Sequence, residues 1–143
     1  MSIAGSDCSG GAGIQADLKT ISALGAYAAT AITAITVQNT TGVRAIHPVP
    51  PVFVRGQIEA VMDDIRPDAI KIGMINDIEI VKVISACLHK YRPAYVIFDP
   101  VMVSTSGHKL IEDDAIAALT DDLMPLTSLI TPNLREAEVL SLI

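Results

Sequence analysis

A glycine-rich run near the start of the chain limits this sequence to a small set of folds. Residues 4–17 read AGSDCSGGAGIQAD and hold four glycines, with two serines and two aspartates among them. Glycine adds little to a hydrophobic core, so such a cluster indicates a main chain that turns tightly and passes close to another group. The segment that follows predicts a helix over residues 14–24 that ends before Gly25. A loop that opens a helix presents N–H groups to a polar or anionic ligand, so we expect a small-molecule site here.

Strand-like and helix-like segments alternate along the chain. Apart from a short apolar start at residues 2–4, strands are predicted over residues 28–37, 43–47, 69–72, 94–98 and 128–131. Helices are predicted over residues 50–65, 78–91 and 113–123 and from Leu134 onward, with a turn at 39–42 and a polar loop at 99–109. This order predicts a single α/β domain over residues 1–143, with a mostly parallel sheet covered by helices on both faces.

Composition and charge exclude several classes of protein. The formal net charge is −6 and no stripe of basic residues occurs, so we expect no nucleic-acid partner. No apolar run is long enough to span a bilayer and no signal peptide is visible, so we expect no membrane association. Cys8 and Cys87 lie far apart without metal-type spacing, which favours a reduced, cytoplasmic protein. The last helix stops at Ile143 without a cap, which indicates a piece of a longer protein.

Two common nucleotide motifs do not fit. Residues 11–16 match the pattern G-x-G-x-x-G/A, but no acidic residue lies between Asp17 and Glu59 to hold a ribose, which excludes NAD. No Gly-Lys-Ser/Thr sequence exists, which excludes the Walker motif. The three histidines, His47, His89 and His108, show no metal-ligand spacing.

Polar or adaptable side chains follow three of the predicted strands. The Gln38 amide can both donate to and accept from the edge of a heterocycle, although its segment also reads as a plain turn. Met74 follows Gly73 and can pad an aromatic ring, or can belong to core and turn. Asp99 stands at a strand end, where it can ligate hydrated Mg²⁺ or simply begin an Asp-Pro turn. Ligands of open α/β sheets bind beyond these strand ends.

Asn133 and Glu136 are three residues apart at the start of the last helix. That spacing predicts a capping box, in which each side chain bonds the other residue's main chain. The alternative is an amide and a carboxylate that hold metal-bound water next to phosphates.

Taken in order, the segments AGSDCSGGAGIQADLKTISALGAY, ITAITVQNT, KIGM, FDPVM and TPNLREAE point to one family. This series resembles the hydroxymethylpyrimidine/phosphomethylpyrimidine kinases of thiamine biosynthesis, members of the ribokinase-like superfamily. The resemblance covers essentially the whole chain, and its first segment and Gln-Asn-Thr are its most specific parts.

The resemblance implies an ATP- and Mg²⁺-dependent kinase that phosphorylates 4-amino-5-hydroxymethyl-2-methylpyrimidine and then its monophosphate, usually as a homodimer. It implies a substrate pocket formed by strand ends that converge on a small heteroaromatic alcohol. Gln38 is expected at the edge of the pyrimidine, and Met74 and Val101 against its ring. The remaining residues carried over are, for the glycine-rich side of the pocket, Gly5, Asp7 and Asp17, and for the Mg²⁺–phosphate region, Asp99, Asn133 and Glu136.

The chain departs from the family pattern in one respect. It contains no Gly-Thr-Gly-Cys and no Gly-x-Gly-Asp, so no catalytic residue is assigned, and the base and anion hole are expected C-terminal to Ile143. A polypeptide that ends at Ile143 is therefore expected not to turn over. Two alternatives stay open: a pyridoxal kinase of the same superfamily, and a pyrimidine-binding module without chemistry.

Overall fold

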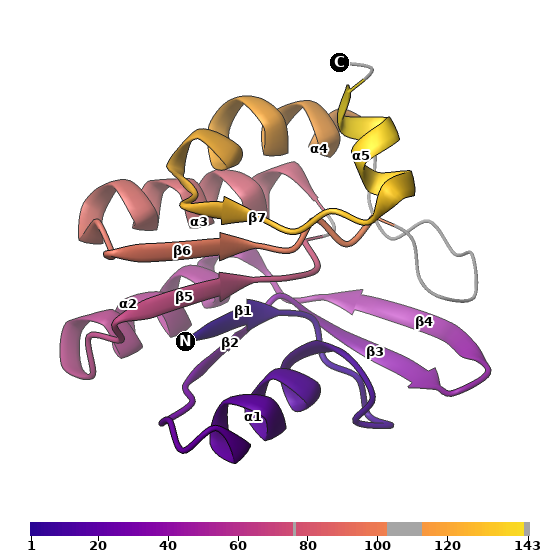
Figure 1. Ribbon diagram of the computed structural model, residues 1–143, viewed down its shortest axis with the longest axis horizontal. Coiled ribbons are helices and arrows are strands. Elements are labelled where there is room, and N and C mark those ends of the chain that lie inside the picture. The colour runs from indigo at the N-terminus through magenta and orange to yellow at the C-terminus, as the bar shows by residue number, and fades with distance from the viewer. Residues whose placement is uncertain (76, 103–112, 142–143) are drawn as a thin grey trace.

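Within the residues that the structure describes, five parallel strands form the main sheet. The computed structural model describes residues 1–75, 77–102 and 113–141. The strands of the sheet lie in the order β2-β1-β5-β6-β7. Their bounds are β1 Ser2–Ala4, β2 Thr30–Ile32, β5 Ala69–Ile72, β6 Tyr95–Phe98 and β7 Leu129–Ile130. Every neighbouring pair runs parallel, which confirms the predicted sheet (Figure 1).

Helices lie on both faces of this sheet, as predicted. Alternate residues of a strand point to opposite faces. Ile3 and Ile72 join the core formed with α2 (Pro51–Asp64) and α3 (Ile78–Tyr91). Their neighbours Ser2 and Lys71 instead contact Asp17 of α1 (Gly13–Ala23), which therefore covers the other face. The core is built from Ile, Val and Leu with one large aromatic residue, Phe98.

The cover on the α1 face is partial. Tyr95 pairs with Ala69 and Leu129 pairs with Ile97, so both point to the same face as Lys71. Their side chains are 62% and 55% exposed. Among the described residues, α1 therefore shields the β1–β2 side of this face and leaves apolar surface over β6 and β7.

The long strand predicted over residues 28–37 is wrong, because the chain leaves the sheet at Thr33. Residues before it form β2, and residues after it form β3 (Ala34–Asn39), which pairs antiparallel with β4 (Gly42–Pro48) in a separate two-stranded ribbon. The Thr33 N–H donates to the Ala4 carbonyl at 3.0 Å, and the Thr33 carbonyl accepts from Val49 N–H at 2.9 Å. Past Ala4 the glycine-rich loop follows β1, and the Ser6 N–H donates to the Ala34 carbonyl at 2.8 Å, so the start of β3 stays bonded to the loop as β3 leaves the sheet.

The other elements follow the predictions closely. Helix α3 has the predicted bounds, and the Asp77 carboxylate caps it by accepting from Ile80 N–H at 3.0 Å. The helix predicted over residues 113–123 is α4 (Asp113–Ala118) continued by a π-helical turn, η1 (Leu119–Leu123), and a 3₁₀ turn, η2 (Met124–Leu126). The last helix, α5, spans Leu134–Ser141. Residues 103–109 of the predicted polar loop, with His108, lie outside the described residues. None of the helices in the described part has the length and apolarity that a bilayer crossing requires.

Candidate functional site

The carboxylate of Asp7 organises the glycine-rich loop. One oxygen, Oδ1, accepts from the Ser9 N–H at 2.9 Å and the Ser9 hydroxyl at 2.7 Å. The other, Oδ2, accepts from Gly11 N–H at 3.0 Å and Ala12 N–H at 2.8 Å. Burial works to raise the pKa of Asp7, but these hydrogen bonds to its charged form outweigh burial and hold the pKa below its ordinary value.

This arrangement corrects one expectation about the loop. N–H groups of the loop were expected to face a ligand, but those of Gly11 and Ala12 donate to the carboxylate of the protein's own Asp7. The anion that the loop and the start of α1 surround is therefore an internal side chain. The loop acts as a rigid wall of the site and does not present these two amides to a phosphate.

Two glycines let the loop and its neighbours approach closely. Gly13, the first residue of α1, has φ +55°, and a Cβ there would overlap the Gly5 carbonyl oxygen and lie 3.3 Å from the Asp7 nitrogen. A Cβ on Gly5 would overlap the Met74 methyl group. Met74 therefore rests directly on the end of β1. Its carbonyl is held in turn by the Thr33 hydroxyl, which donates at 2.8 Å.

A pocket of about 280 Å³ opens beyond the carboxyl ends of β1, β5 and β6. Asp7, Gln38 and Met74, which the sequence predicts to converge, share this one hollow. Of the residues predicted for the site, the lining includes Gly5, Asp7, Asp17, Gln38, Met74, Asp99 and Val101. The ribbon brings Gln38 to the pocket from the side. The main-chain carbonyl of Gln38 accepts from the exposed thiol of Cys8 at 2.9 Å.

Three polar lining residues lie outside the predicted set: Ser6, Thr36 and Lys71. The Ser6 hydroxyl accepts from Thr36 N–H at 3.0 Å, and the Thr36 hydroxyl donates to the Ser6 carbonyl at 2.7 Å, which ties the loop to the ribbon. Lys71 carries a signal that the sequence analysis missed. It is a lone charge within the apolar strand AIKI, and a charge in such a strand requires a partner on the same face.

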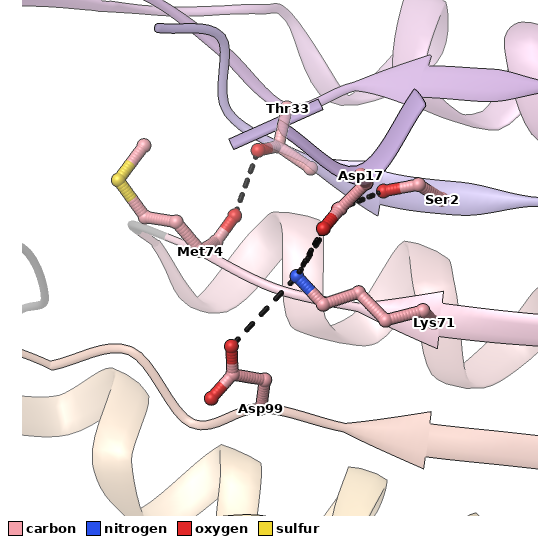
Figure 2. A network of polar contacts seen from close by, with 6 residues as sticks. All are labelled: Ser2, Asp17, Thr33, Lys71, Met74 and Asp99. Atoms are coloured by element: carbon pink, nitrogen blue, oxygen red, sulfur yellow. Dashed lines mark hydrogen bonds and ion pairs between the residues drawn. The ribbon is translucent and has the colours of Figure 1, made fainter. Parts of the chain in front are cut away.

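Three charged side chains that line the pocket contact one another, and Figure 2 shows how Asp17, Lys71 and Asp99 lie. The Lys71 amine lies 3.1 Å from Asp17 Oδ2 and 3.7 Å from Asp99 Oδ2. The Ser2 hydroxyl donates to Asp17 Oδ2 at 2.5 Å. A single cation thus connects two carboxylates from α1 and from the end of β6.

Asn133 and Glu136 lie outside the residues that line the pocket. The Asn133 side-chain oxygen accepts from Glu136 N–H at 3.0 Å, and Glu136 Oε2 accepts from Asn133 N–H at 2.8 Å. These reciprocal bonds confirm the predicted capping box.

Cys8 and Cys87 are both free thiols, and burial raises the pKa of Cys87. Within the described residues, no three His, Cys, Asp or Glu side chains gather as a metal site.

Comparison with known proteins relates the chain to one family. The model of the family described as phosphomethylpyrimidine kinase matches residues 7–143 of the chain. The chain belongs to the phosphomethylpyrimidine kinase family. It is 49% identical over 140 residues to the hydroxymethylpyrimidine/phosphomethylpyrimidine kinase of Escherichia coli, with 98% of this chain and 53% of that protein covered. It is 50% identical over 141 residues to a bifunctional thiamine biosynthesis protein of Geobacter sulfurreducens, with 99% and 29% covered.

Solved structures of family members and of related vitamin kinases share the fold. The crystal structure of phosphomethylpyrimidine kinase from Clostridium difficile superposes with a TM-score of 0.93 at 52% identity, covering 99% of this chain and 62% of that one. Pyridoxal kinase from Staphylococcus aureus in complex with pyridoxal superposes with a TM-score of 0.87 at 38% identity, covering 98% and 52%. These matches confirm the ribokinase-like architecture expected from the sequence. The chain spans about half the length of the single-function kinases that it matches.

Proposed function

We propose that this chain supplies the acceptor pocket of a kinase that phosphorylates 4-amino-5-hydroxymethyl-2-methylpyrimidine and then its monophosphate, in thiamine biosynthesis. The observation that carries the proposal is that Asp17 of α1, Gln38 of the ribbon and Met74 after β5 line one pocket. A ring that lies on Met74 would meet the amide of Gln38 at its edge and the carboxylate of Asp17 on its opposite side. These groups match a flat heterocycle that both donates and accepts hydrogen bonds.

The proposed reaction uses ATP as phosphoryl donor. The oxygen of the acceptor's hydroxymethyl group forms a bond to the γ-phosphorus, the bond from that phosphorus to the β–γ bridging oxygen breaks, and ADP leaves. The hydroxyl proton passes to a base, which the family resemblance places outside these 143 residues. The residues of this chain bind and orient the acceptor, which is a large part of what such a transfer requires.

The described residues supply only part of a Mg²⁺ site. Mg²⁺ in kinases is bound by one or two carboxylates together with phosphates and water. Asp99 lines the pocket with its side chain 37% exposed, so it can contribute one such carboxylate. When bound, Mg²⁺ would neutralise charge on the transferred phosphoryl group. Asn133 and Glu136 are engaged in their capping box, and a role for them near the phosphates stays a prediction.

A binding experiment tests this proposal. The chain is expected to bind 4-amino-5-hydroxymethyl-2-methylpyrimidine in isothermal titration calorimetry. Gln38→Ala is expected to weaken that binding by about 1–3 kcal/mol, because its amide would no longer satisfy the ring edge. Asn39→Ala is the matched control, since Asn39 is exposed, lies outside the pocket and bonds Thr41 in the turn.

Several outcomes would count against the proposal. Equal affinities for Gln38→Ala and the unaltered chain would remove Gln38 from the site. Tighter binding of pyridoxal than of the pyrimidine would favour the pyridoxal kinase alternative, which the 38% identity to such kinases supports. Incubation of this chain with ATP, Mg²⁺ and the pyrimidine is expected to yield no phosphorylated product, and clear turnover would contradict the expectation that the base lies elsewhere.

A homodimer formed through the outer face of the ribbon is also part of the proposal. Ile35 and Val37 point away from the body and are exposed, whereas Ala34 and Thr36 are buried. Light scattering after size exclusion is expected to give about twice the 15.1 kDa chain mass, and Val37→Lys is expected to give the monomer, because it places a charge in an apolar contact. A monomer for the unaltered chain would contradict the proposed homodimer.

The cytoplasmic location stays a prediction.

A further inference from the structure

Lys71 occupies an unusual position for a lysine. It lies in the middle of the sheet on β5, between apolar neighbours, and only 29% of its side chain is exposed. Its amine reaches both oxygens of Asp17, at 3.1 and 3.2 Å, and approaches Asp99. Figure 2 shows the amine between the two carboxylates. Because this ion pair is partly buried, solvent screens it less than it screens a surface pair. The pair therefore restrains the Asp17 carboxylate that lines the pocket.

The contacts of Asp17 restrict what this carboxylate can offer a ligand. Ser2 and Lys71 together engage both of its oxygens from the side of the sheet. A carboxylate has about four acceptor positions, so some capacity remains on the side that lines the pocket. Held in this way, Asp17 accepts hydrogen bonds from a ligand N–H group in one fixed direction.

Gly73 provides independent support for a role of the Lys71 amine. A Cβ at Gly73 would lie 2.9 Å from the Lys71 nitrogen and 3.0 Å from the Ala4 Cβ. The absence of a side chain at this position therefore leaves the space that the amine occupies. The Gly73 main chain donates to the Ile3 carbonyl at 2.8 Å, so the backbone has little freedom to relieve a clash.

We infer that Lys71 is a positioning residue that acts through Asp17, and that Gly73 serves the site by making room for the Lys71 amine. The inference rests on the proposed function, since the ligand N–H that Asp17 meets is the exocyclic amine of the pyrimidine. Lys71 also separates Asp17 and Asp99 by a positive charge. Without it the two carboxylates would repel each other, and Asp17 would lose its fixed direction.

The test compares two ligands: 4-amino-5-hydroxymethyl-2-methylpyrimidine and its analogue without the amine. Lys71→Met is expected to weaken binding of the amino ligand by about 10- to 100-fold and to abolish the preference over the analogue, because a charged hydrogen bond is lost. Gly73→Ala, which leaves every charge intact, is expected to act in the same direction. Lys71→Arg keeps the cation and is expected to restore much of the preference. The double variant Lys71→Met with Gly73→Ala is expected to bind as Lys71→Met alone does.

Matched controls are available in the chain. Lys82→Met removes a surface lysine that pairs with Glu79, and Gly56→Ala adds a methyl group to α2 where no atom lies within 4 Å. Both are expected to leave the two affinities unchanged. Equal losses for both ligands in Lys71→Met would indicate a general structural role and would overturn the inference. Additive losses in the double variant would overturn the proposed link between Gly73 and Lys71.

The proposed function and this inference fail in different ways. If the unaltered chain binds neither pyrimidine, the proposed function fails, and the ligand role of Lys71 fails with it. The link to Gly73 is then decided by urea unfolding of the unaltered chain, Lys71→Met, Gly73→Ala and the double variant. Gly73→Ala is expected to lower the midpoint more in the unaltered chain than in the Lys71→Met background, where only the contact with the Ala4 Cβ remains. Equal decreases in both backgrounds would overturn the link.

Discussion

Replacing Asp7 by asparagine is expected to lower the free energy of unfolding by about 3–5 kcal/mol, because a buried, charged acceptor of four hydrogen bonds is lost. Asp7 is 2% exposed and receives donors from Ser9, Gly11 and Ala12. An asparagine amide would direct its own N–H groups at some of these donors. Urea unfolding at pH 7, followed by circular dichroism, measures the loss. Asp64→Asn, at an exposed position of α2, is the matched control and is expected to change little.

The unfolding free energy that is lost in Asp7→Asn is expected to become smaller as the pH falls. The pKa of Asp7 is lowered in the folded protein, so its stabilising effect is complete above the unfolded value of about 4 and declines as pH falls through the folded pKa. The difference in unfolding free energy between the unaltered chain and Asp7→Asn is therefore expected to shrink in acid. A difference that stays constant from pH 7 down to pH 2 would show that the charge of Asp7 is not what holds the loop.

Gly13→Ala is expected to destabilise the chain by about 2–5 kcal/mol through two separate effects. The positive φ of +55° is unfavourable for any residue with a Cβ, and the added Cβ would overlap the Gly5 carbonyl oxygen. The neighbouring contact between Ile14 N–H and that same carbonyl, at 3.0 Å, fixes the start of α1 against β1. Thermal unfolding measured by calorimetry should show a clearly lower midpoint.

Gly25→Ala separates the two effects. Gly25 also has a positive φ, +79°, but nothing lies within 4 Å of a Cβ placed there. This variant is expected to lose only about 1–2 kcal/mol, the cost of the backbone conformation alone. If Gly13→Ala and Gly25→Ala lose the same free energy, close packing of α1 on Gly5 contributes nothing to stability.

The order of elements could be predicted because each depends on local pattern. The periodic apolar residues of α3 and the short apolar strand β5 gave correct bounds, as did the capping box at Asn133 and Glu136. The break at Thr33 could not be predicted in this way. Residues 28–37 are uniformly suited to a strand, and the break depends on where β1 ends, which is a tertiary property.

For the site, too, some features could be predicted from the fold class, whereas others depend on tertiary contacts. Parallel strands bring their carboxyl ends to one edge, so the fold class predicted a hollow shared by Asp7, Gln38 and Met74, although Gln38 reaches it from the ribbon. The role of Asp7 inside its own loop, and the bridge that Lys71 forms between two carboxylates, depend on side-chain directions. A lysine in an apolar strand indicates that a partner exists but does not identify it.

The departure of the ribbon from the sheet at Thr33 has an evolutionary consequence. The ribbon leaves at Thr33 and rejoins the body at Val49, which are bonded to each other, so its length is independent of the sheet register. Insertions or deletions at its Asn39–Gly42 tip would change how far the ribbon extends from the body and would leave Lys71 and Asp17 in place. A lineage can thus resize one hairpin beside the pocket while it inherits the ion pair between Lys71 and Asp17 unchanged.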